Sequence, residues 1–273
     1  MAKKKSDTPN EIRLIKQMER MRRQFEKNNA SDAQELVYDA WEANDPAEAC
    51  SLFEQALELD RTNVDAWLGL MQFTPLDQEE RIDMLKKLVE MGADNLGNKA
   101  FKTDKGHFWG ILETRPYMRA RGQLAQALVE AGRLDEAVVE HEAMLELNPG
   151  DNQGIRYGLL ALYLAQKRLE DAAKMFKNNK EREYSAIFGW AYVLERFLVG
   201  DMTGAEQALK QTCERNPHAK AYFLGHRKLP KHMPGSYAMQ SREEAMIAYD
   251  IMGLAWKKHP NAKKWLKEQC AKG

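Results

Sequence analysis

The sequence predicts an all-α fold built from helical hairpins, and three observations support this prediction. Of the 273 residues, 44% are apolar and 30% charged, with only 17 glycines and 9 prolines, which suits a helix-rich protein. Four segments share a small residue followed four positions later by a bulky one. The small residues of the last three segments are separated by 35 and 33 positions.

These repeats predict how the helices pack. The small residues are Ala49, Ala137, Ala172 and Ala205, and the bulky residues are Phe53, His141, Phe176 and Leu209. A small residue lets two helices approach closely, and the bulky residue one turn later fills the space between them. The spacing brackets the 34-residue period of a tetratricopeptide repeat. We therefore expect a tetratricopeptide-like helical-hairpin solenoid with a C-terminal capping helical segment.

The repeat register is interrupted between Ala49 and Ala137, where "GADNLGNKAFKTDKGHFWG" is rich in glycine and polar residues. A segment of this composition is typical of a loop. Five regions are expected in chain order: a basic N-terminal segment with a disordered start and then a helix (1–29), two hairpins (30–91), a connecting loop (92–108), three tetratricopeptide-like hairpins (109–219), and a loop with capping helices (220–273).

Charge and cysteine usage narrow the class of protein. The chain has 41 basic and 41 acidic residues, so no overall field attracts nucleic acid or membrane. The 3 cysteines form no CxxC pair, which favours reduced thiols over a disulfide framework or zinc site. The sequence has no secretory signal and no apolar run long enough to span a membrane. We expect a cytoplasmic protein without a membrane span, metal or cofactor.

Four stretches of the chain resemble one family. They are "HFWGILETRPYMRA", "LELNPGDNQGIRYGLL", "NPHAKAYFLGHRKLP" and "SREEAMIAYDIMGLAW". Over about residues 105–270 the chain resembles the tetratricopeptide-like core of the suppression-of-tumorigenicity-seven family and its soluble bacterial relatives. This resemblance implies a helical repeat protein and provides no catalytic residues. Some animal members carry membrane-spanning segments, which this chain lacks.

An arginine cluster lies at the starts of the first and second hairpins of the C-terminal set. Arg121 and Arg156 occupy a helix position that is usually apolar in such repeats. A guanidinium there needs acceptors to offset its desolvation. The cluster is thus interpreted either as a structural ion-pair network or as an anion site. Its members are Glu113, Arg115, Arg121, Asp151, Asn152 and Arg156.

The first helix of each hairpin is expected to line a concave groove that binds a protein or peptide partner. The sequence predicts Arg119, Gln126, Tyr157 and Trp190 as partner-binding residues. An alternative is that the C-terminal helices fold back and fill the apolar end of this groove.

A second functional class remains open at this level. The arginine cluster and the basic loop at 226–232 could bind RNA or a small anionic ligand, although a short basic loop is more often merely solvated. The sequence contains no nucleophile motif, metalloprotease motif or phosphate loop, which favours a non-catalytic scaffold. A protein or peptide remains the expected partner, with nucleic acid the weaker alternative.

Overall fold

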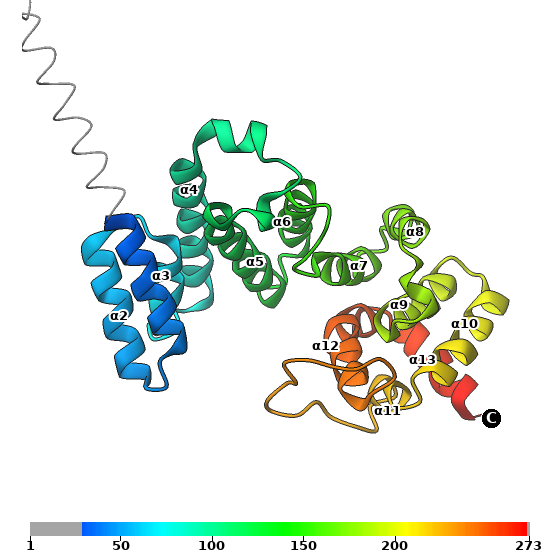
Figure 1. Cartoon of the computed structure of the whole chain (residues 1–273). Helices are drawn as coiled ribbons and strands as arrows, with labels where there is room; N and C mark the ends of the chain where they lie inside the picture. Colours follow the sequence, from blue (N-terminus) through cyan, green and yellow to red (C-terminus); the bar gives the residue numbers. More distant parts are fainter. Residues whose placement is uncertain (1–28, 272–273) are drawn as a thin grey trace, which may run out of the picture. The chain divides into compact units, whose positions relative to one another are not determined.

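The computed structural model describes residues 29–271, apart from the side chain of Arg182 (Figure 1). The expectations for the segment 1–29 therefore fall outside the described residues, except at Asn29. The described part of the chain consists of helices joined by turns and loops, and it contains no β-strand. The all-α, helical-hairpin fold class is confirmed. Among the described helices, none is both long enough and apolar enough to span a membrane.

The chain forms two compact units, which divide after Ala127 within α5. Unit 1 contains a helix at 29–42, α2 (Pro46–Leu59), α3 (Val64–Leu70), α4 (Gln78–Thr103), η1 (Phe108–Gly110), η2 (Leu112–Thr114) and most of α5 (Arg115–Glu130). Unit 2 contains α6 (Leu134–Leu147), α7 (Ile155–Ala165), α8 (Leu169–Asn178), η3 (Lys180–Glu183), α9 (Ala186–Leu198), α10 (Met202–Arg215), α11 (Ala219–Phe223), α12 (Arg242–Lys258) and α13 (Pro260–Ala271).

Small side chains allow the helices of unit 1 to pack closely. Ala33 and Val37 of the first helix are fully buried against Ala49 and Phe53 of α2. A Cβ atom added at Gly69 of α3 would lie only 2.4 Å from the Phe53 ring. Glycine is therefore required for the aromatic ring to pack on the α3 backbone. The repeat register read from the sequence accounts for this contact.

The prediction of a connecting loop at 92–108 is wrong, because α4 continues to Thr103. Gly92 lies in this helix, where an added Cβ atom would be 3.3 Å from the Cα atom of Tyr117. The glycine serves close helix packing here rather than a flexible connection. Near the end of this helix, Phe101 forms a cluster of rings with Phe108 and Tyr117, with centroids 5.2–6.1 Å apart. The polar segment is thereby tied to the start of α5.

Gly97 breaks the regular geometry of α4, with φ 66° and ψ 165°. This conformation is almost exclusive to glycine. We expect Gly97→Ala to reduce the free energy of unfolding by about 2 kcal/mol, since no other atom lies near enough to add a clash. Urea denaturation would measure the loss. Gly110→Ala is the matched control, because its surroundings are equally open and its φ is ordinary; equal stability of the two variants would contradict the prediction.

In unit 2, successive helices pack against each other from α6 to α7, from α7 to α8, and from α9 to α10. The aligned small residues Ala137, Ala172 and Ala205 are all fully buried. Of the bulky residues four positions later, Phe176 and Leu209 are buried, whereas His141 is only half-buried. The repeat register thus places the predicted interface residues between helices of this unit.

The C-terminal helices of unit 2 cover the helices that were expected to line a groove. Helix α12 packs against both α7 and α9, and α13 packs against α9 (Figure 1). Buried Glu244 of α12 accepts hydrogen bonds from the Ala186 N–H of α9 (2.9 Å) and the side chain of Asn216 (2.9 Å). A buried carboxylate bonded in this way fixes α12 to the start of α9. The expected alternative, in which the C-terminal helices fill the apolar groove, describes this arrangement.

Candidate functional site

A cavity of about 490 Å³ opens in unit 1 between the first helices of successive hairpins. The helix at 29–42, the start of α3 and the start of α5 surround it, and α4 completes one wall. We call this space the unit 1 cavity. Its principal lining residues are Gln34, Tyr38, Asn63, Leu112, Pro116 and Arg119.

Apolar side chains at the unit 1 cavity are unusually exposed. Tyr38 is 45% exposed and Leu112 is 59% exposed, whereas Tyr117 beside them is buried. Trp41 lies one turn from Tyr38, with ring centroids 5.7 Å apart, and is 44% exposed. Exposed apolar side chains that gather around a concave surface are typical of a site for another molecule.

One lining residue of this cavity, Arg119, forms an ion pair with Asp65. The Arg119 guanidinium donates two hydrogen bonds to the Asp65 carboxylate, with 2.7 Å between Nε and Oδ1. Asp65 is completely buried at the first turn of α3. The guanidinium also lies 5.1 Å from the centre of the Trp41 ring. Because this pairing is bidentate, the charge of Arg119 is neutralised within the protein.

Gln34 connects the ion pair to the rest of the wall. Its amide nitrogen is 3.5 Å from Oδ2 of Asp65, and its amide oxygen accepts a hydrogen bond from Asn63 (3.3 Å). Asn63 also caps α3 by accepting the Ala66 N–H at 2.9 Å. The first helix and α3 are therefore joined by side-chain hydrogen bonds at the site.

The remaining charged groups that line the cavity are acidic. They are Glu35, Asp60 and Glu113, and no lysine lies among the lining residues. With Arg119 already paired to Asp65, these three carboxylates set the local charge. A cationic group would therefore be attracted to this cavity, and an anion repelled.

The predicted partner-binding residues have different surroundings. Arg119 lines the unit 1 cavity, whereas Gln126 is exposed on α5 outside the lining set. Tyr157 and Trp190 belong to unit 2. Trp190 is completely buried, stacked on Phe223 with centroids 4.0 Å apart. Its assignment to partner binding is therefore corrected, because α11 and α12 cover the ring.

The unit 1 members of the arginine cluster interact mainly with aromatic groups. Arg115 donates from Nε to the Trp109 carbonyl oxygen (3.0 Å) and lies over the Trp109 ring. The Arg121 guanidinium lies 5.5 Å from the centre of the Tyr117 ring. Glu113 is exposed and lines the cavity. Cation–π contacts of this kind fix the start of α5.

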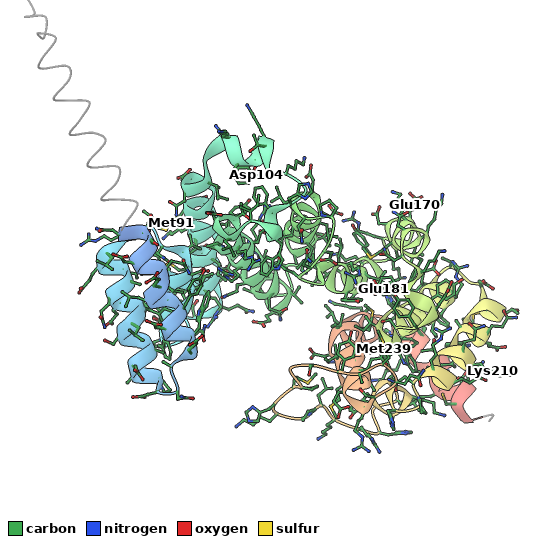
Figure 2. All side chains as sticks on the ribbon, viewed as in Figure 1. Met91, Asp104, Glu170, Glu181, Lys210 and Met239 are labelled. Carbon is green, nitrogen blue, oxygen red and sulfur yellow. The ribbon has the colours of Figure 1, made fainter. Side chains whose placement is uncertain are left out.

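The unit 2 members form an ion-pair network, in which Asn152 is exposed and takes no described part. Arg156 donates to Asp151 Oδ2 (2.7 Å) and Glu181 Oε1 (2.8 Å). The Tyr157 hydroxyl donates to Glu181 Oε2 at 2.7 Å. Glu181, labelled in Figure 2, comes from η3 between α8 and α9. Burial and the hydrogen bond to Glu181 raise the pKa of Tyr157, so the phenol stays protonated.

Several of these residues had no signal in the sequence. Tyr38 and Leu112 are ordinary apolar positions, and only the structure shows that both remain exposed at one cavity. Asp65 and Glu181 are separated from their arginine partners by 54 and 25 positions. Such long-range pairing depends on the stacking of hairpins, which a local pattern does not specify.

The basic loop is exposed at its three cations and at both histidines: Arg227, Lys228, Lys231, His226 and His232. These side chains surround none of the cavities described in unit 2. Arg156 is paired to carboxylates, and Arg115 and Arg121 lie over aromatic rings, so the alternative hypothesis depends mainly on this loop.

Comparison with known proteins supports the fold. The family model described as tetratricopeptide repeat matches residues 128–178, which include α6, α7 and α8. No curated protein matches the chain. The match coincides with the segment in which the 35-residue spacing was read from the sequence. The chain therefore carries a tetratricopeptide repeat in unit 2 and is a tetratricopeptide-like protein in its fold.

Proposed function

We propose that the chain is a non-catalytic scaffold that binds a protein or peptide partner in the unit 1 cavity. Tetratricopeptide repeats generally act as protein-interaction scaffolds, and the repeat in unit 2 supports the same role here. The observation that carries the proposal is the exposure of Tyr38 and Leu112 at a cavity between the first helices of consecutive hairpins.

The geometry favours an elongated partner segment with an apolar anchor. A cavity of about 490 Å³ accommodates a few side chains rather than a folded surface. Tyrosine is enriched among the residues that dominate binding energy, and its hydroxyl can still bond to water or partner. Asn95 and Gln34 add amide groups at the wall. A partner segment would thus find apolar contacts and a few orienting hydrogen bonds in one place.

The alternative is an RNA or small-anion binder that uses the basic loop at 226–232. Its three exposed cationic side chains, Arg227, Lys228 and Lys231, support it. Binding to phosphates would weaken steeply with salt. This alternative is less favoured, since Arg156 of the arginine cluster is bonded to carboxylates, Arg115 is bonded to a backbone carbonyl, and Arg121 lies over the Tyr117 ring.

Truncating the exposed apolar groups tests the proposed function. We expect Tyr38→Ala/Leu112→Ala to weaken the affinity for the partner at least about tenfold, because such residues contribute about 1–2 kcal/mol each when buried in an interface. Affinity capture from the native lysate would first identify proteins retained by the wild type. Calorimetry with each purified candidate would then measure the dissociation constants.

Tyr184→Ala/Val139→Ala is the matched control. These unit 2 side chains are 52% and 59% exposed, close to the values for Tyr38 and Leu112. The control should bind like the wild type. If every purified candidate binds both variants equally, the unit 1 cavity is not the partner site.

A further inference from the structure

Charge is distributed very unevenly between the segment 1–28 and the described part of unit 1. Residues 29–127 contain 18 acidic and 10 basic residues, a net charge of −8. The 28 residues before them contain 9 basic and 4 acidic residues, a net charge of +5. Opposite charges joined in one chain attract each other over about a Debye length, ~8 Å at physiological salt. The overall neutrality of the protein conceals this complementarity.

The basic segment joins the described structure at the edge of the unit 1 cavity. Ala30 and Ser31, the second and third described residues, both line this cavity. An extended chain spans about 3.3–3.6 Å per residue, so 28 residues reach further than the cavity is wide. Tethering at this point gives a local concentration on the order of millimolar. The segment therefore needs only weak intrinsic affinity to occupy the cavity.

The composition of the segment matches what the cavity offers. Apolar residues recur every third or fourth position from residue 12 onward: Ile12, Ile15, Met18, Met21 and Phe25. Basic residues lie between them: Arg13, Lys16, Arg20, Arg22 and Arg23. The cavity presents exposed Tyr38 and Leu112 together with three carboxylates. Apolar anchors interspersed with cations would satisfy both features, as amphipathic segments do in apolar grooves.

We infer that the chain's own basic segment, residues 1–28, occupies the unit 1 cavity in the absence of a partner. Its apolar side chains cover Tyr38 and Leu112, and its cations pair with Glu35, Asp60 and Glu113. A partner must displace this segment before it binds. The inference that this segment occupies the cavity depends only on the features of the cavity and the segment. The inference that a partner must displace the segment rests on the proposed function.

Hydroxyl-radical footprinting of the full chain tests this occupancy without any partner. The readout is the oxidation rate of Tyr38 and Leu112 relative to Tyr184, which is 52% exposed in unit 2. We expect Arg20→Glu/Arg22→Glu/Arg23→Glu to raise this ratio roughly three- to fourfold, because release from a mostly occupied state uncovers both side chains. Raising the salt to about 1 M should produce the same rise in the wild type, since it screens the pairing.

The matched control reverses three cations elsewhere. Arg227→Glu/Lys228→Glu/Lys231→Glu changes the net charge equally but leaves the N-terminal segment intact, so the ratio should equal that of the wild type. Unchanged oxidation in the N-terminal variant overturns the inference, as does an equal rise in both variants. Protection that increases over about a hundredfold range of protein concentration also overturns it, since the occupant is then a second copy. Partner binding through Tyr38 and Leu112 can succeed in each of these cases, so the two proposals fail separately.

Discussion

Replacing Arg119 with alanine should lower the free energy of unfolding of unit 1 by about 3 kcal/mol. The substitution leaves the Asp65 carboxylate completely buried without its bidentate partner. Only the longer contact from Gln34 would remain, at 3.5 Å. A buried charge that loses its partner costs far more than the net contribution of the pair, because its desolvation is no longer offset.

Region-resolved hydrogen exchange is the appropriate measurement, since the two compact units can open separately. The slowest amides of α3 and of residues 115–127 should exchange faster in Arg119→Ala, while those of α9 and α10 stay unchanged. Adding Asp65→Asn should restore part of the loss, because the remaining buried group is then neutral. Arg61→Ala, which removes an exposed guanidinium from the same unit, should change stability by less than about 0.5 kcal/mol.

The same pairing limits what an Arg119 variant can reveal about binding. Loss of a partner from such a variant would follow from local unfolding as readily as from a lost contact. Tyr38 and Leu112 are better probes, because each is about half exposed and neither holds the ion pair. If Arg119→Ala proves as stable as the wild type, Asp65 is solvated in solution and Arg119 becomes available to a ligand.

The hairpin fold could be predicted from the sequence because its packing is local and periodic. Ala137, Ala172 and Ala205 recur at nearly constant spacing, and each lies fully buried between helices. The error at 92–108 has a physical origin in the two roles of glycine. Gly92 permits close contact with Tyr117, while Gly97 provides a break in α4, and a sequence shows only that both are glycine.

The candidate site was predictable only in part, because exposure depends on contacts between distant segments. Arg119 was expected to face a groove, and it lines the unit 1 cavity. Trp190 was placed in the same groove by helical position, but α11 and α12, which begin more than 25 residues later, cover it. Neither the covering of α9 nor the pairing of Asp65 follows from the pattern within a single helix.

The second large effect is expected at Arg156, which connects three parts of unit 2. Its guanidinium bonds to Asp151 before α7, to Glu181 in η3 and to the Tyr157 hydroxyl (3.0 Å). Asp151 also accepts the Ile155 and Arg156 N–H groups, at 2.6 and 3.0 Å, and so caps α7. Both carboxylates are buried, at 7% and 9% exposure.

Arg156→Ala would leave these two carboxylates near each other without the cation that lies between them. We expect the free energy of unfolding of unit 2 to fall by about 3 kcal/mol. Hydrogen exchange should become faster in α7 and α9 and stay unchanged in α3. Arg156→Lys should recover only part of this stability, because an ammonium cannot reproduce the planar fork that bonds both carboxylates. Arg227→Ala controls for the loss of an exposed arginine in the same unit. If Arg156→Lys is as stable as the wild type, the positive charge alone matters. If Arg156→Ala is as stable as the wild type, the network is dispensable for stability, and Arg156 is free to serve the anion site.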